Sequence, residues 1–264
     1  MGNDPDYDPA MMRGGTVTET FERYEFKYWA PLGRLESSMK FLQGVMQEDE
    51  VASRAGGSQV NTSLYFDSPN FFFLGQHLSG SPDRIKLRTR YYGDRPGGDC
   101  FFEIKRRQGM VVTKRRAVVA HAEAQKLVSN ITGPLPVQNE ALEAFQYLAV
   151  RCTARPVLLV RARRQAFRAT DSSLDVRLTI DRDIAWQPTR APDFLLPDHR
   201  HWRPIEGGDE RQPRALVEVK FHSARPWWLG QFAERLAPWR VSFSKYVAAA
   251  LEARTDPFFT MDAA

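Results

Sequence analysis

Basic side chains recur at every second position of one predicted strand, a pattern typical of a surface that binds a polyanion. Four cations alternate with apolar or uncharged residues in the segment 83–91, namely Arg84, Lys86, Arg88 and Arg90. Because side chains of a strand point to alternate faces, these four lie on one face. Like charges placed side by side repel each other, so such a face needs a reason to exist. A polyanion that lies along the strand would be one.

Five further predicted strands pair a charged face with an apolar one. Their charged faces carry Arg23, Glu25 and Lys27; Glu103 and Lys105; Lys114 and Arg116; Asp175, Arg177 and Asp181; and Glu218 and Lys220. For any single strand, a solvated outer face is the simpler interpretation. In the whole set, however, the charged faces are mostly basic, and amphipathic helices are available to cover the apolar faces. We therefore predict that the charged faces point into a barrel, where the low dielectric makes unpaired cations select phosphate chains.

Three carboxylates lie two residues from a lysine on the same predicted face: Glu25, Glu103 and Glu218. Ion pairing that spaces the cations is a sufficient explanation for Glu25 and Glu103. The alternative is ligation of Mg²⁺ or Mn²⁺, which prefer carboxylates together with substrate phosphate oxygens. Glu218 is our candidate metal ligand, because Val217 and Val219 flank it in a strand that the pattern predicts to be buried.

Composition sets the class of protein but does not locate the function. The chain has 264 residues, is 42% hydrophobic and 26% charged, and carries a formal net charge of +5. These values suit a soluble globular protein of one large or two small domains. Two cysteines, Cys100 and Cys152, make no disulfide framework, so we expect a cytoplasmic protein. No stretch is apolar enough to span a membrane, and membrane attachment would need a partner protein.

The predicted elements give an α+β fold, an antiparallel β-barrel of about eight strands flanked by helices. Strands are expected at 20–29, 59–67, 84–92, 100–107, 110–119, 156–169, 174–183 and 215–222, and helices at 31–50, within 120–149 and at 226–253. Since strands outnumber the helices between them, this is not a βαβ sheet. We expect a flexible tail at 1–18, a domain at 19–256 with an inserted loop at 186–213, and a tail at 257–264.

Nine short motifs resemble the VTC domain, the polyphosphate polymerase module of the vacuolar transporter chaperone complex. This family belongs to the triphosphate tunnel metalloenzymes, together with the CYTH phosphatases and cyclases. The motifs follow in order from Phe21 to Leu251: FERYEFKYW, LYFDS, KLRTRYY, FEIKRR, TKRR, RRQAF, VRLTIDRD, LVEVKF and SFSKY. Each motif alone is a weak signal, but nine in the same order are a strong one.

The resemblance implies a tunnel lined by basic residues, with ATP and polyphosphate or pyrophosphate as ligands and Mn²⁺ or Mg²⁺ as cofactor. We assign catalytic roles to Arg88, Arg90, Lys105, Arg164 and Arg177, and phosphate binding to Lys27, Lys86, Lys114, Arg116, Lys220 and Lys245. Arg164 and Lys245 rest on the resemblance alone. Glu218 matches the metal-binding glutamate, with Glu25 and Glu103 as supporting carboxylates. Asp181 shares the charged face of its strand and is a further candidate to support the metal.

The first strand departs from the superfamily signature Glu-x-Glu-x-Lys, because Arg23 replaces the first glutamate. This change favours a polymerase-type tunnel, in which the γ-phosphoryl group of ATP passes to a polyphosphate chain. A second hypothesis is hydrolysis of triphosphate or nucleotide, with Glu25 orienting water. A third is a polyphosphate-binding module without turnover. Nucleic acid is not expected, since most aromatic residues fall on the opposite strand face from the cations. The phosphate-sensing domain and membrane helices of the eukaryotic complex are absent, so we expect a single-domain member.

Overall fold

The structure is a computed structural model that describes residues 17–21, 24–50, 53, 56–93, 98–189, 202–205, 213–222 and 225–255. Its strands are β1 (Val17–Phe21), β2 (Tyr24–Pro31), β3 (Met46–Glu48), β4 (Gln59–Asp67), β5 (Asp83–Tyr92), β6 (Asp99–Gln108), β7 (Val111–Ala120), β8 (Arg155–Ala169), β9 (Val176–Pro188), β10 (Arg203–Pro204) and β11 (Arg214–Phe221). Its helices are α1 (Leu32–Phe41), α3 (Phe72–Leu78), α4 (His121–Ser129), α5 (Glu140–Arg151), α6 (Trp227–Leu236), the 3₁₀ turn η2 (Ala237–Trp239) and α7 (Lys245–Thr255).

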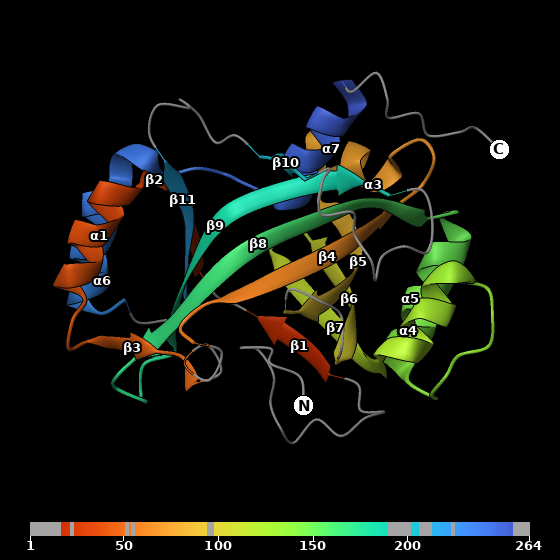
Figure 1. Ribbon diagram of the computed structural model, residues 1–264, viewed down its shortest axis with the longest axis horizontal. Coiled ribbons are helices and arrows are strands. Elements are labelled where there is room, and N and C mark those ends of the chain that lie inside the picture. Colours follow the sequence, from red (N-terminus) through yellow and green to blue (C-terminus); the bar gives the residue numbers. More distant parts are fainter. Residues whose placement is uncertain are drawn as a thin grey trace.

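One antiparallel sheet of eleven strands organises the described chain, in the order β1-β7-β6-β5-β4-β8-β9-β11-β2, with β3 and β10 pairing with β8 and β9. Its two end strands, β1 and β2, follow each other in the sequence with only residues 22 and 23 between them. One end of each edge strand therefore lies near the other, and the sheet curls around an interior (Figure 1). No ladder joins β1 to β2 among the described residues, so the predicted eight-strand barrel is corrected to a larger sheet that is curled but not closed.

Helices cover the outer face of the curled sheet, as the apolar strand faces predict. On one side α4 and α5 pack against β5, β6 and β7, and on the other α1 and α6 pack against β2, β9 and β11 (Figure 1). Phe145 of α5 packs edge-on against both Phe66 and Phe102, with ring centroids 5.2 Å apart in each pair. Burying these apolar faces outside leaves the charged faces directed inward.

The expected helix at 31–50 is shorter in the structure. Helix α1 ends at Phe41, and the chain then turns through Gly44, whose φ of 87° favours glycine, before entering β3. Met46 pairs with Ala169 at the end of β8, so residues predicted to extend the helix extend the sheet instead. Strand pairing outweighs the helical spacing of these apolar residues, because β8 offers a free edge beyond its partners.

Three other predicted boundaries are corrected. Residues 17 and 18, expected in the tail, belong to β1. The expected inserted loop 186–213 is partly sheet, since Trp186 of β9 pairs with Arg203 of β10. The expected helix at 226–253 divides at η2 and the following segment, where Pro238 interrupts it. The rest of the expected tails and most of the insertion lie outside the described residues.

Candidate phosphate-binding site

The inward faces of three neighbouring strands bring their charges into register. Lys105 of β6 lies opposite Lys86 of β5 on one side and opposite Lys114 of β7 on the other. Two residues along, Glu103 lies between Arg88 and Arg116 in the same way. The alternation predicted from sequence is therefore confirmed, and it produces a row of lysines beside a row in which one carboxylate separates two arginines.

Glu103 collects three cations and is 2% exposed. It accepts hydrogen bonds from Arg88 Nε at 2.6 Å and from Arg116 Nη2 at 2.6 Å, and Lys114 Nζ lies 3.3 Å away. Burial raises the pKa of Glu103, but the three cations hold it well below its usual value. One carboxylate beside three cations leaves a net positive charge. This geometry supports the ion-pairing interpretation of Glu103. Arg116, 3% exposed and bonded to Glu103, stabilises this arrangement.

Asp181 is the fully buried counterpart on β9. It accepts two hydrogen bonds from Arg164, at 2.7 and 2.8 Å, and a third from Lys245, the first residue of α7. Burial raises the pKa of Asp181, but Arg164 and Lys245 hold it below its usual range. The strand that the sequence predicts to end at residue 183 continues to Pro188. The two cations assigned by resemblance alone thus meet at one carboxylate.

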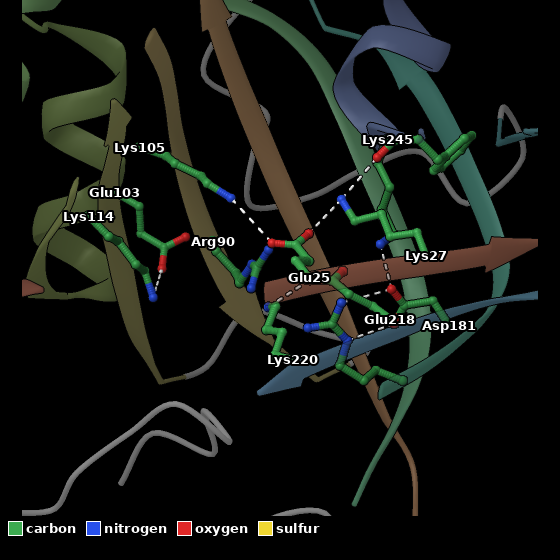
Figure 2. A network of polar contacts seen from close by, with 12 residues as sticks. Glu25, Lys27, Arg90, Glu103, Lys105, Lys114, Asp181, Glu218, Lys220 and Lys245 are labelled. Carbon is green, nitrogen blue, oxygen red and sulfur yellow. Dashed lines mark hydrogen bonds and ion pairs between the residues drawn. The ribbon is translucent and has the colours of Figure 1, made fainter. Parts of the chain in front are cut away.

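Glu25 connects opposite walls of the curled sheet. Its carboxylate lies 2.8 Å from Lys27 Nζ on its own strand and 3.9 Å from Lys105 Nζ on β6, a strand far from β2 in the sheet order (Figure 2). Burial and the nearby Glu218 raise the pKa of Glu25, but the surrounding lysines outweigh them and lower it. An ion pair between distant strands shows that the charged faces converge on one interior.

Glu218, the candidate metal ligand, lies on β11 with one oxygen 2.7 Å from Lys220 Nζ. Burial raises its pKa, but Lys220 and neighbouring cations hold it well below its usual value. Since Glu25 pairs with Lys220 across the ladder, Glu25 and Glu218 are diagonal neighbours on the inward face. Two carboxylates completed by phosphate oxygens and water fit Mg²⁺ or Mn²⁺. A site made by protein alone does not fit, since no cluster of three or more acidic, histidine or cysteine ligands occurs in the described part of the chain.

Lys86 and Lys27 donate hydrogen bonds to uncharged oxygens of the segment before α7. Lys86 Nζ lies 2.8 Å from Ser244 Oγ, and Lys27 Nζ lies 3.0 Å from the Phe243 carbonyl. Burial, followed by the repulsion of Lys105, Lys27 and other cations, lowers the pKa of Lys86 to about 7. Burial, followed by the repulsion of Lys220 and Lys27, lowers the pKa of Lys105 to about 8 against the opposing effect of Glu25, although half of its side chain is accessible. For Lys86, burial and the neighbouring cations therefore act in the same direction, and both disfavour its charged form.

Arg90 and Arg88 also contact uncharged groups that charge patterns did not identify. Arg90 Nε donates to Ser63 Oγ at 3.1 Å, and Arg88 Nη1 donates to the Tyr65 hydroxyl at 3.4 Å. Ser63 and Tyr65 are two residues apart in β4, so strand alternation places them on one face. The sequence analysis selected residues by charge, and neither of these two is charged. A further unpredicted contact joins Arg177 to Asp49, whose charged groups lie 3.8 Å apart.

All eleven predicted basic residues therefore lie on inward strand faces or at the start of α7, and within the described ranges they outnumber the carboxylates that face them. Each of the eleven has a hydrogen bond or an ion pair to a neighbouring side chain: Lys27, Arg88, Arg90, Lys105, Lys114, Arg116, Arg164, Arg177, Lys220, Lys245 and Lys86. Arg23, the departure from the first-strand signature, lies outside the described residues. The described residues thus form a curled antiparallel sheet with an inward cluster of excess positive charge.

The family model of the VTC domain matches residues 22–253, and the chain belongs to this family. A curated relative, subunit 4 of the vacuolar transporter chaperone complex from Trypanosoma cruzi, is 26% identical over 85% of this chain, which spans about a third of that protein (32%). Among solved structures, a putative adenylate cyclase from Bacillus halodurans is 12% identical, with a TM-score of 0.50 over 85% of this chain and 95% of the other. That likeness supports the fold alone. No described helix has both the length and the apolar character that a membrane crossing requires.

Proposed function

We propose that this protein is a polyphosphate polymerase that moves the γ-phosphoryl group of ATP onto the end of a polyphosphate chain. The observation that carries the proposal is the excess of cations on the inward faces, most evident at Lys86, whose pKa falls to about 7 among other cations. Membership of the VTC domain family, and the relative named as subunit 4 of the transporter chaperone complex, support the same activity. A chain of phosphates is the ligand that neutralises a row of basic side chains over its length.

Phosphoryl transfer needs positioning and charge stabilisation more than covalent chemistry from the protein. Arg88 and Arg90 present guanidinium groups that suit two oxygens of one phosphate, while Lys27, Lys86, Lys105 and Lys114 supply point charges beside them. Buried carboxylates hold the arginines in place, as Glu103 does for Arg88 at 2.6 Å. A polyphosphate terminus is already anionic, so it acts as the nucleophile without a general base.

Glu218 and Glu25 are the residues that would hold Mn²⁺ or Mg²⁺. When bound, the metal would neutralise charge on the phosphates and on the leaving ADP. Neighbouring lysines keep both carboxylates ionised against burial: Lys105, Lys27 and Lys220 lower the pKa of Glu25, and Lys220 and Lys27 lower that of Glu218. An ionised carboxylate is the form that binds a hard divalent cation.

The test is incubation of purified protein with ATP and Mn²⁺, followed by electrophoretic detection of chains longer than three phosphates. Arg88→Ala and Glu218→Gln are expected to lower the rate about 100-fold or more, whereas Arg151→Ala, on the exposed face of α5, leaves it unchanged. Release of orthophosphate alone would identify a hydrolase, and binding without turnover a non-catalytic module. Wild-type rates in both site variants would show that the residue assignment is wrong.

A further inference from the structure

Tyr65 lies among the proposed phosphate-binding cations, although it carries no charge. Strand β4 directs Leu64 and Phe66 into the outer core cluster and Ser63 and Tyr65 to the opposite face, where the ring of Tyr65 packs in a buried apolar cluster with Tyr246 of α7. The Tyr65 hydroxyl accepts a hydrogen bond from Arg88 Nη1 at 3.4 Å. Arg90 and Lys245 are also near enough to lower the pKa of Tyr65 against the effect of burial, which raises it. The phenol therefore lies where cations from β5 and α7 converge.

A second buried contact, with the ring of Tyr246, fixes the orientation of the Tyr65 ring. It stacks on Tyr246 of α7, with centroids 5.0 Å apart and planes inclined by 29°. The Tyr246 hydroxyl donates to Asp67, which is fully buried and also accepts the backbone N–H groups of Phe73 and Leu74 at 2.9 and 3.0 Å. Asp67 thus ties α3, α7 and β4 together. A ring fixed in this way requires no reorganisation when a ligand binds.

The hydroxyl of Tyr65 has an unused donor. In its contact with Arg88 the phenol oxygen accepts, and across the described residues we find no acceptor for the phenol proton. The side chain is buried, with the whole residue 6% exposed. Burying a hydroxyl proton without an acceptor costs free energy. The neighbouring cations attract an anionic oxygen to the same place, and that oxygen would be the acceptor.

We propose that Tyr65 is a substrate-contacting residue whose hydroxyl donates a hydrogen bond to a phosphoryl oxygen gripped by Arg88 and Arg90. This inference rests on the proposed function, because it takes the ligand to be a chain of phosphates. A phenol adds a directional hydrogen bond without adding charge, which the crowded lysines cannot do. Tyr65 thereby defines the binding position of one phosphoryl group on a face whose charges otherwise attract phosphates without fixing their position.

The decisive variant is Tyr65→Phe, which removes the hydroxyl and keeps the ring and its stacking. The matched control is Tyr91→Phe, since Tyr91 is a buried tyrosine of the neighbouring strand β5 whose ring enters the outer core. Calorimetric titration with tripolyphosphate gives the affinity, turnover of ATP with Mn²⁺ gives kcat and KM, and thermal melting reports folding. We expect Tyr65→Phe to weaken tripolyphosphate binding about tenfold or more and to melt like the wild type, with no change in binding for Tyr91→Phe.

A second comparison separates substrate contact from mere support of Arg88. If Tyr65 contacts the phosphate, Tyr65→Phe also weakens binding about tenfold in an Arg88→Ala background. If its effect vanishes in that background, or is absent in the wild type, the inference is overturned. Failure of the proposed function gives a different result. If the wild type binds tripolyphosphate but makes no polymer, the polymerase proposal is refuted, while the binding comparison still tests the contact of Tyr65 with the phosphate. A wild type that binds no tripolyphosphate overturns both.

Discussion

Binding of a phosphate chain should be coupled to proton uptake at Lys86. This lysine is surrounded by cations from every side: Lys27 on β2, Arg84 and Arg88 on β5, and Lys105 on β6. Their repulsion, added to burial, lowers its pKa from 10.5 to about 7. At pH 8 only about a tenth of Lys86 is protonated in the free protein. A bound polyanion reverses the local potential and restores the charged form, so binding at pH 8 should take up about 0.9 proton.

The magnitude follows from the size of the shift. A change of 3.5 pKa units corresponds to about 5 kcal/mol, an upper bound because Lys86 is only partly buried and solvent screens it. Affinity for tripolyphosphate should fall as the pH rises above 7, by up to about tenfold per unit. Below pH 7, where Lys86 is already protonated in the free protein, this dependence should level off.

The assay is calorimetric titration with tripolyphosphate at pH 8 in buffers of different ionisation enthalpy, which gives the number of protons taken up. Lys86→Met should reduce that number, and the difference from the wild type removes the ligand's own titration. Lys126→Met is the control, because Lys126 is 73% exposed on α4. Equal proton uptake by the wild type and Lys86→Met would refute the reasoning, since the depressed pKa would then not belong to Lys86.

Two further predictions concern the free protein. Asp181→Asn leaves Arg164 and Lys245 buried without their carboxylate and should lower the free energy of unfolding by about 3–5 kcal/mol. The control is Asp183→Asn, because the side chain of Asp183 is 76% exposed. Equal denaturant midpoints for the two variants would contradict the prediction. Because the folded pKa of Lys86 lies below its unfolded value, the unfolded chain binds more protons between pH 7 and 10.5. Its contribution to the unfolding free energy should therefore rise with pH in that window, and Lys86→Met should remove this rise in urea denaturation curves.

The sequence predicts the faces of the strands well, because alternation depends only on local geometry. Leu87 and Phe102 enter the outer core while Arg88 and Glu103 turn inward, as their positions require. The partners of each charge could not be predicted in the same way. Arg164 meets Asp181 through the pairing of β8 with β9, and a bulge between Arg161 and Arg163 shifts that register. Such irregularities depend on the whole sheet and leave no signal in either strand alone.

The sequence analysis also missed uncharged residues that contact the site, for a different reason. Tyr65 and Ser63 alternate correctly for the inward face, but a search for cations and carboxylates passes over them. Lys245 reaches the site only because α7 packs on β8 and β9, a tertiary contact that places a helical residue beside Asp181. The curled sheet explains why the site combines residues so distant in sequence: β2, at one end of the strand order, and β6, the third strand from the other end, face each other across the interior.

The contacts divide the cations into two groups that should respond oppositely to mutation. Arg116 and Arg164 are bonded to buried carboxylates and stabilise the fold, whereas Lys86 and Arg90 are bonded to neutral oxygens and retain their attraction for anions. Removing a carboxylate by Glu103→Gln should therefore lower the melting temperature, and it should weaken tripolyphosphate binding less than Lys86→Met does, through the loss of the contact that positions Arg88. Lys86→Met should raise the melting temperature and weaken binding, since it relieves repulsion in the free protein and removes a phosphate ligand.

Paired measurements of melting temperature and tripolyphosphate affinity on the two variants check this division. The expected result is that Glu103→Gln lowers the melting temperature and Lys86→Met raises it while weakening tripolyphosphate binding. Crowding of cations, which costs stability in the free protein, would then be the source of affinity for the phosphate chain. Loss of stability and affinity together in both variants would mean that Lys86 is held as firmly in the fold as Arg116. The affinity would then have to come from groups other than those left with neutral partners.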